Sequence, residues 1–394
     1  MKSNYTNLDL LRSLAVMSVV AAHMLSGCLQ FHLCSENLAL GQFLHNLSIT
    51  GVMFFFVHTC LVLMLSMHRA PDMNRGRSFL VRRAFRIYPL CWATILLVLA
   101  TGLTDQPNHS LHFIGFGEIA ANLLLVQNIL PFHGGASVIG PLWSLPWEVQ
   151  MYLVLPFFFT FLRRFTRLYV VFAIWGGATL LAVAASLPWV SHAHLHGTVY
   201  PPLFIAGMVA YKLLERRSAK PRRKELPAWI WPFFVLGLFV LLASVMRDPW
   251  YWTPHGAIID SSICLALSLA IPVFEELQAR WIVLPAQQIA KYSYGVYLLH
   301  VPAIVFVFSY LPGLPLALKI VASLALTAFL SFVSFHTIEN PLILIGKRLT
   351  QPVLGTAKAA CGMAFETSLA DQTTPAAQLT AGDTLGIEAP TLAD

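Results

Sequence analysis

The stretch "NLDLLRSLAVMSVVAAHMLSG", Asn7–Gly27, decides the fold class. It is mostly apolar and long enough to cross a bilayer, because a spanning helix needs about 20 residues. Yet it carries Asp9, Arg12 and His23. Ionisable side chains are costly in hydrocarbon, and inside membrane helices they normally face a protein interior or a water-filled cavity. The stretch therefore predicts a membrane helix with one functional polar face.

Similar apolar runs recur along the chain. Of its 394 residues, 57% are hydrophobic and 11% are charged, with a mean hydropathy of +0.69. An average soluble domain has about 25% charged residues. We therefore predict an all-α polytopic integral membrane protein with about ten transmembrane helices. They are expected near 8–27, 44–66, 87–103, 142–162, 168–187, 199–214, 229–246, 258–274, 292–311 and 315–336. The shorter apolar segment 119–130 is expected to be an interfacial or re-entrant helix.

The basic residues predict the orientation. The net charge is +7, and Lys and Arg cluster in alternate loops between the apolar runs. With the N-terminus in the cytoplasm, Arg247 is the one basic residue in an outer loop, as the positive-inside rule expects. This pattern predicts an N-in/C-in multi-pass protein of the cell inner (plasma) membrane, and it excludes a nucleic-acid partner. Residues 1–345 form the predicted membrane domain, and 346–394 form a cytoplasmic, disordered tail.

Two smaller patterns leave alternatives open. Cys28 and Cys34 fall in one loop and can pair if that loop faces an oxidising compartment. His192, His194 and His196 alternate in another loop, which is either a metal site or simply a polar loop that holds histidines. No metal or permanently bound cofactor is predicted elsewhere. The first apolar run is too long for a signal-peptide core, so we expect it to be retained.

Arg12 and His23 lie on one face of the first predicted helix. Eleven residues make three turns plus about 20°, and they separate the two side chains by about 16 Å along the axis. Asp9 shares roughly the same face. His23 lies deeper and can act as a base near neutral pH. Alternatively, Asp9 and Arg12 are interfacial, with the Arg12 side chain reaching to the headgroups.

A second basic pattern occurs in "FLVRRAFRIYPL", Phe79–Leu90. Arg83 and Arg86 are three residues apart and share a helix face. Paired guanidinium groups suit a phosphate-bearing ligand, because each can bind two phosphate oxygens. The alternative is that these arginines only anchor the inner end of the helix.

An acidic residue, Glu148, lies near the outer end of the fourth predicted helix, in "GPLWSLPWEVQMYLVLP", Gly140–Pro156. Trp143 and Trp147 are ordinary residues for a membrane interface. Glu148 is unusual if it lies below the headgroups, where it can orient a histidine or hold an acceptor hydroxyl.

Two further residues are ambiguous. His300 lies in the middle of a predicted helix, in "YSYGVYLLHVP", and is either functional or a core histidine hydrogen-bonded to a neighbouring helix. Glu339, in "FHTIENP", is expected at the cytoplasmic end of the last helix, where it can pair with an arginine of the 82–86 cluster.

Together these stretches resemble membrane-bound acyltransferase family 3, over roughly residues 5–345. The resemblance rests on Arg12 and His23 as the family's Arg-x10-His pattern, and on Arg83-x-x-Arg86-Ile-x-Pro89. It also rests on "GVMFFFVHTCLVLML", "WSLPWEVQMYLVLP", "YSYGVYLLHVP" and "IENP". Several motifs in the right order make the resemblance specific. No extracytoplasmic hydrolase-like domain is evident, so the chain resembles the stand-alone type.

The resemblance implies a membrane-bound O-acyltransferase. Such proteins take an acyl group, most often acetyl from acetyl-CoA, on the cytoplasmic side. They deliver it to a hydroxyl of an extracytoplasmic or lipid-linked glycan. The expected catalytic residues are His23, as general base, with Glu148 and Arg12. The expected acyl-CoA-binding residues are Arg83, Arg86 and Arg12. The implied partners are acyl-CoA, a glycan or lipid-linked sugar acceptor, and membrane lipid.

A different class of function also fits intramembrane His, Arg and Glu. A proton-coupled transporter or flippase of a lipid-linked glycan would use such residues as proton relays or substrate contacts. Transporters often contain internal repeats, and none is visible between the halves of this sequence. An enzyme consumes thioester without an ion gradient, whereas a transporter depends on the gradient and forms no covalent product.

Overall fold

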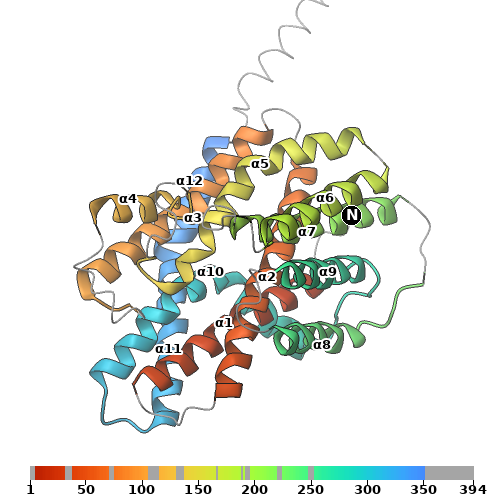
Figure 1. Ribbon diagram of the computed structural model, residues 1–394. Coiled ribbons are helices and arrows are strands. Elements are labelled where there is room, and N and C mark those ends of the chain that lie inside the picture. Colours follow the sequence, from red (N-terminus) through yellow and green to blue (C-terminus); the bar gives the residue numbers. More distant parts are fainter. Residues whose placement is uncertain are drawn as a thin grey trace, which may run out of the picture. The chain divides into compact units, whose positions relative to one another are not determined.

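A computed structural model describes residues 5–31, 38–70, 75–104, 115–129, 137–165, 167–187, 190, 196–219, 224–246 and 253–350. Within these ranges the chain is helical and forms no sheet, which confirms the all-α prediction (Figure 1). The α-helices are α1 (Thr6–Gln30), α2 (Leu38–Arg69), α3 (Arg75–Thr101), α4 (Phe116–Leu124), α5 (Leu145–Arg164), α6 (Leu168–Ala185), α7 (Pro201–Ser218), α8 (Ile230–Val245), α9 (Pro254–Ala270), α10 (Arg280–Tyr310), α11 (Leu316–Ser334) and α12 (Asn340–Thr350).

Every predicted span coincides with a helix. In the described residues, seven helical segments are long and apolar enough to cross a membrane, and α8 and α9 are shorter apolar helices. The chain is therefore a helical membrane protein. The count of ten spans and the N-in/C-in orientation stay predictions. The segment expected to be short contains α4, which has nine residues.

Several helix boundaries differ from the prediction. Helix α3 begins at Arg75 rather than 87, and α10 begins at Arg280 rather than 292. Hydropathy marks only the apolar part of a helix, whereas Arg, Lys, Gln and Ala continue it readily on the polar side. Helix α9 begins four residues earlier than expected, because Thr253 caps it by accepting a hydrogen bond from the Gly256 amide at 3.1 Å. Helix α12 continues past the predicted domain boundary at 345.

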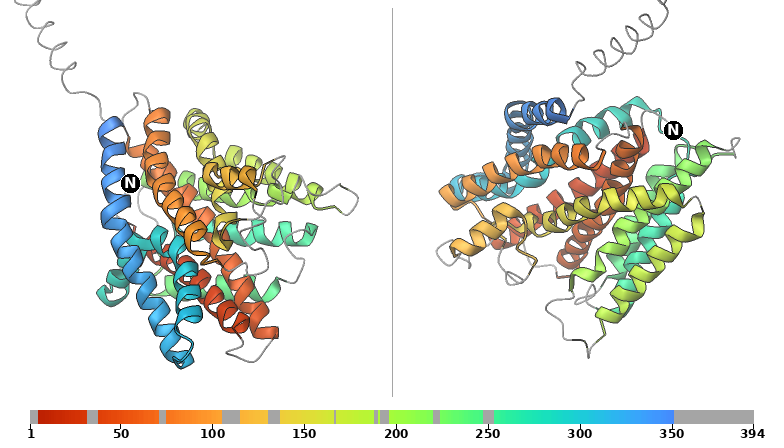
Figure 2. Two further views of the ribbon diagram at one scale, coloured as in Figure 1. Left: turned by 90° about the vertical axis from the view of Figure 1, so that its left-hand side faces the viewer. Right: turned by 90° about the horizontal axis from the view of Figure 1, so that it is seen from above.

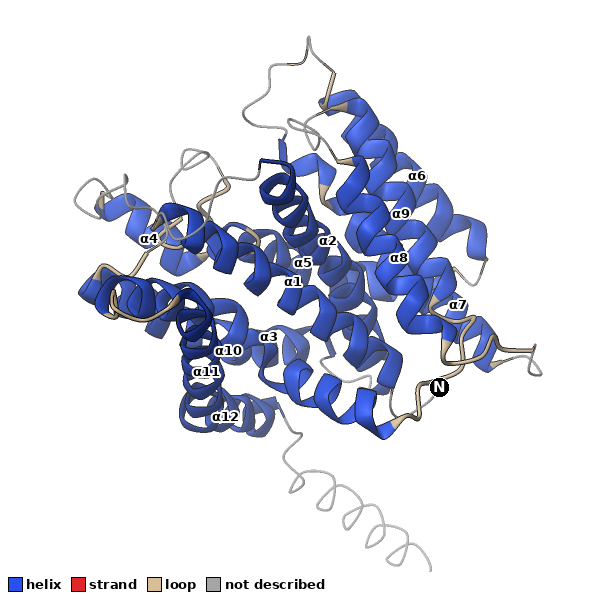
Figure 3. Cartoon of the chain, turned by 90° about the horizontal axis from the view of Figure 1, so that it is seen from below, coloured by secondary structure: helices blue, strands red, loops and turns tan. Residues whose placement is uncertain are grey.

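Helix α2 connects two groups of helices. Helices α6, α7, α8 and α9 lie side by side, and α7 and α8 pack against α2. On the other side of α2 lie α1, α3, α5 and α10 (Figure 3). Helices α11 and α12 run along α10 and α3 (Figure 2). Because α2 touches both groups, it is the most buried of the apolar helices, with 78% of its apolar window inside the protein.

A glycine sets the approach of α7 to α2. A Cβ atom at Gly207 would lie 2.4 Å from the Val57 carbonyl oxygen and 2.8 Å from the Cβ of Cys60. Small residues allow membrane helices to pack closely, and packing contributes much of their association. Cys60 is fully buried in this contact, as expected for an apolar filler.

We predict that Gly207→Ala destabilises the protein, because the new methyl group meets backbone that cannot move independently. Overpacking of this kind costs about 1–3 kcal/mol. The measurement is the melting temperature of the purified protein in detergent. Gly237→Ala is the matched control, since a Cβ atom there meets nothing within 4 Å. Equal melting temperatures for the two variants would contradict this account of the α2–α7 contact.

Candidate active site

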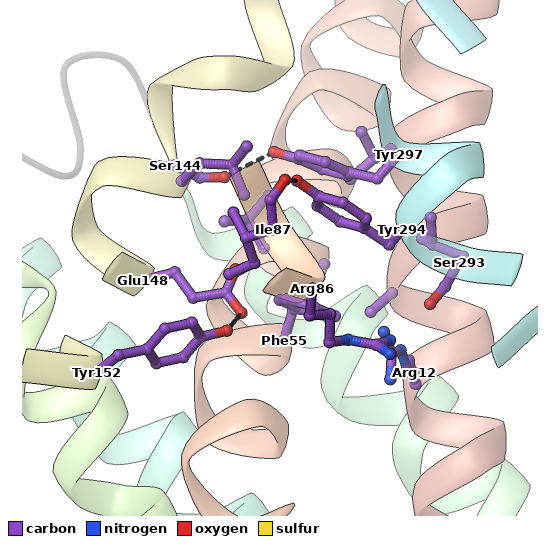
Figure 4. Close-up of a pocket in the computed structure, with 16 residues that line it drawn as sticks. Arg12, Phe55, Arg86, Ile87, Ser144, Glu148, Tyr152, Ser293, Tyr294 and Tyr297 are labelled. Carbon is purple, nitrogen blue, oxygen red and sulfur yellow. Dashed lines mark hydrogen bonds between the residues drawn. The ribbon is translucent and has the colours of Figure 1, made fainter. Parts of the chain in front are cut away.

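A buried cavity lies where five helices of the described structure meet (Figure 4). Helices α1, α2, α3, α5 and α10 each contribute part of its wall. The lining residues are Arg12, Ala15, Val16, Val19, Gly51, Val52, Phe55, Arg86, Ile87, Ser144, Leu145, Glu148, Tyr152, Ser293, Tyr294 and Tyr297. The cavity therefore brings together residues from the first, second, third, fourth and ninth predicted spans.

Two positive charges converge on this cavity. Figure 4 shows the side chains of Arg12 and Arg86 with their guanidinium ends toward one another. The Arg12 guanidinium lies 5.6 Å from the centre of the Phe55 ring, and its buried Nε has no hydrogen-bond partner in the described structure. Like charges repel, and a buried charge needs compensation. The pair is therefore suited to an anionic group of a ligand.

The compensating acid within the protein is Glu148. Its side chain is only 7% exposed and accepts a hydrogen bond from the hydroxyl of Tyr152. It interacts electrostatically with Arg12, Arg83 and Arg86. Glu148 is thus buried inside the cluster of arginines. The sequence placed these residues on three separate helices without showing that they meet.

Arg83 has a different position from Arg86. It is not among the residues that line this cavity, and it lies 5.8 Å from the centre of the Phe79 ring. It is close enough to Tyr152 and Glu148 to interact with both electrostatically. Because α3 begins at Arg75, both arginines lie well inside a helix, rather than at its inner end. Only Arg86 faces the cavity directly.

Hydroxyl groups fix the opposite wall of the cavity. The Tyr297 hydroxyl donates to the Pro141 carbonyl at 2.9 Å and lies 2.7 Å from the Ser144 hydroxyl (Figure 4). The Tyr294 hydroxyl donates to the carbonyl of Ile87 at 2.6 Å and so joins α10 to α3. These bonds hold the helices around the cavity in a defined arrangement.

Sequence reasoning missed the roles of Ser144, Tyr152 and Tyr297. A signal was present, because Ser144, Glu148 and Tyr152 are spaced four residues apart and so share a face of α5. No signal from one sequence could show that Tyr297 meets Ser144, since 153 residues separate them.

His23 lies one helical turn beyond Val19, the last α1 residue in the cavity wall. Its Nδ1 is 3.0 Å from the Val19 carbonyl oxygen. A carbonyl oxygen can only accept, so Nδ1 carries the hydrogen and Nε2 is the basic nitrogen. His23 therefore has the tautomer that a general base at Nε2 requires. Hydrogen bonds join His23 to Val19 and Glu148 to Tyr152, and the orienting role of Glu148 stays a prediction.

His23 has an aromatic neighbour on α10. Its ring centre lies 4.9 Å from that of His300, in an edge-to-face arrangement. His300 is fully buried, and its Nδ1 is 3.0 Å from the Val296 carbonyl of its own helix. Its Nε2 has no partner in the described structure. Of the two alternatives for His300, a hydrogen bond to a neighbouring helix is not seen in the described structure, because the i−4 carbonyl satisfies Nδ1 instead; a functional role stays a prediction.

Glu339 is buried and lies close to Arg86, one of the arginines with which it was expected to pair. It is 1% exposed and ends a π-helix, η5 (Phe335–Glu339), between α11 and α12. It interacts electrostatically with Arg86 and Arg12, although neither carboxylate oxygen has a hydrogen bond in the described structure. π-helical turns often occur at functional sites. Here the turn brings a second acid toward the arginine pair.

Some predicted sites lie outside the described residues. They include Cys34, His192, His194 and the tail after Thr350. Among the residues that the structure describes, no three His, Cys, Asp or Glu side chains are grouped as metal ligands would be. The candidate chemistry of the described part is therefore that of arginines, carboxylates, hydroxyls and two histidines.

Comparison with known proteins identifies the family. Residues 5–336 match the family described as "Acyltransferase domain", acyltransferase family 3. A curated relative is Nodulation protein 10 of Rhizobium leguminosarum bv. viciae, which is 29% identical over 205 residues. That match covers 49% of this chain and about half, 52%, of the relative's length. No solved structure matches the chain. Because the family match covers most of its length, the chain belongs to acyltransferase family 3.

Proposed function

We propose that this membrane acyltransferase moves an acyl group from acyl-CoA to a hydroxyl of an extracytoplasmic or lipid-linked glycan. Acetyl-CoA is the proposed donor, and the inner (plasma) membrane is the proposed location. One observation carries the proposal. A cavity that holds two facing arginines is lined by α1 as far as Val19, and His23 lies one helical turn further along the same helix. This arrangement pairs an anion-binding region with a base for a hydroxyl.

The separation between the two regions suits the donor. Arg12 and His23 lie about 16 Å apart along α1. A single reacting carbonyl cannot touch both residues. An extended donor can, because CoA carries phosphates at one end of its pantetheine arm and the thioester at the other. Between the two residues, α1 lines the cavity with the small or apolar Ala15, Val16 and Val19. We therefore assign phosphate binding to Arg12 and Arg86, with Arg83 supporting them, and the reaction to the His23 end.

The proposed reaction is direct transfer. His23 Nε2 accepts the proton of the acceptor hydroxyl, whose oxygen attacks the thioester carbonyl carbon. The C–O bond forms, the C–S bond breaks, and the leaving thiolate takes the proton back from His23 as free CoA thiol. An acyl-enzyme route, in which His23 is acylated first, uses the same two regions. His300 contacts the ring of His23 and restricts its orientation.

Glu148 and Tyr152 act on the donor side in this proposal. Glu148 balances part of the positive charge of the three arginines and fixes their positions. Asp9 has a similar role, since it interacts electrostatically with Arg12 at the start of α1. These acids keep the guanidinium groups together when no anionic ligand is present.

We predict that His23→Ala abolishes acyl transfer. Positioned proton transfer typically contributes about 10²–10⁴-fold to a rate. The measurement is label transfer from radiolabelled acetyl-CoA into the glycan fraction of membranes, at equal protein abundance. His45→Ala is the control, because His45 is an exposed histidine of α2 outside the cavity. Equal transfer by His23→Ala and wild type would remove His23 from the chemistry. Gradient-dependent movement of the glycan without any label transfer would favour a transporter.

We also predict that Arg86→Gln weakens donor binding. A charge-assisted hydrogen bond contributes about 1.5–3 kcal/mol, so the Kd for CoA should rise roughly 10–100-fold. Calorimetric titration of CoA into the detergent-purified protein measures this. Arg77→Gln, at an exposed position in the first turns of α3, is the matched control and should bind as wild type does. An unchanged Kd for Arg86→Gln would refute the phosphate-binding role.

A further inference from the structure

A second pocket lies beside the candidate active site, between the first half of α1 and the last half of α2. Its volume is about 280 Å³, near the lower end of the ~300–1,000 Å³ range of small-molecule sites. The lining residues are Tyr5, Leu8, Asp9, Arg12, His58, Val62, Leu65, Ser66 and Arg69. We call this pocket the vestibule. The catalytic proposal above uses none of its residues except Asp9 and Arg12.

Arg12 lines both the vestibule and the active-site cavity. The Phe55 ring lies at this junction, because Arg12 packs over it at 5.6 Å and His58 stacks on it with ring centres 6.1 Å apart. A ligand that contacts Arg12 from one pocket therefore reaches the boundary of the other. The two pockets share Arg12 as a lining residue, so a long ligand could contact it from both sides.

His58 shows that the vestibule is built for a polar ligand. Its side chain is 4% exposed, yet its Nδ1 has no hydrogen-bond partner in the described structure. A buried polar atom without a partner costs about 1–3 kcal/mol. A hydroxyl or phosphate oxygen of a ligand in the vestibule would remove that cost. His58 lies beside Arg12, so such a group would also meet a positive charge.

The other residues that line the vestibule are apolar, aromatic and charged. Leu8, Val62 and Leu65 supply apolar walls, and Tyr5 supplies an aromatic ring. Arg69, an exposed residue at the end of α2, places a second positive charge about 16 Å from the level of His58 along the helix. Asp9 and Ser66 add hydrogen-bonding oxygens. The apolar walls and the ring suit a planar base, and the cations at the two ends suit the phosphate groups on either side of a ribose.

We infer that the vestibule binds the 3′-phosphoadenosine end of the acyl-CoA donor. The diphosphate lies at Arg12 and His58, the adenosine lies between Leu8, Val62 and Leu65, and the 3′-phosphate meets Arg69. This inference rests on the proposed function, because it divides one donor between two pockets. It adds the nucleotide subsite and gives His58 a role in donor recognition.

The inference predicts a pattern across donor fragments, measured by calorimetric titration of the full-length protein in detergent. His58→Leu should weaken binding of CoA and of 3′-dephospho-CoA by about tenfold each and leave S-acetyl-pantetheine unchanged. Arg69→Gln should weaken binding of CoA alone, since only CoA carries the 3′-phosphate. His45→Leu, an exposed position on the same helix, and Arg77→Gln are the matched controls and should bind all three compounds as wild type does. Unchanged elution and a melting temperature no lower than that of wild type establish that each variant is folded.

Other outcomes overturn the inference in distinguishable ways. If wild type binds CoA and His58→Leu binds it equally well, the nucleotide lies elsewhere and the proposed function stands. If His58→Leu weakens the binding of S-acetyl-pantetheine as much as the binding of CoA, the vestibule holds the pantetheine arm instead. If phosphatidylglycerol in the micelles displaces CoA from wild type, and Arg69→Gln removes that competition, the vestibule is a lipid headgroup site. If wild type binds no CoA at all, the proposed donor is wrong and the inference fails with it.

Discussion

The confinement of Arg12 and Arg86 in one buried cavity is the constraint on which the rest of the structure depends. Two guanidinium groups in a helical membrane bundle repel each other and cannot leave for water. Their position requires Glu148 and Glu339 nearby, and it requires the helices that carry these acids to meet α1 and α3. The hydroxyl bonds that join α10 to α3 and to the start of α5 hold this arrangement together.

Helix α2 lies between the charged cavity and the helices α6, α7, α8 and α9. One side of α2 faces the cavity through Gly51, Val52 and Phe55, and the other side packs on α7 at Gly207. The packing of α2 on α7 depends on the close fit of the two helices rather than on charge. The protein therefore divides its bundle into a polar half, which holds the candidate chemistry, and an apolar half formed by α6, α7, α8 and α9. The apolar half supports α2 without contributing to the cavity wall.

Hydropathy was enough to predict the helices, because every predicted span coincides with one. It could not predict where α3 and α10 begin, since their first turns are polar and helical at once. Helical spacing placed Arg12 and His23 on one face, and the family motifs selected Arg86 and Glu148. Contacts between segments that are far apart in the sequence could not be predicted from it. Neither the approach of His300 to His23 nor the burial of Glu339 follows from local pattern, because both depend on how α10 and α11 pack.

The π-helix at Phe335–Glu339 makes the positions of the residues after it sensitive to insertions and deletions in this segment. A π-turn holds one residue more than an α-turn, so it acts as a single-residue insertion absorbed within a continuous helix. Deleting one residue there would restore a regular α-helix and rotate everything beyond it by about 100°. Glu339 would turn away from the arginines, and Gly346 would lose its close fit against Phe85. A one-residue deletion would therefore move Glu339 and Gly346 together, whereas exchange of the exposed His336 or Thr337 would leave the register of the helix unchanged.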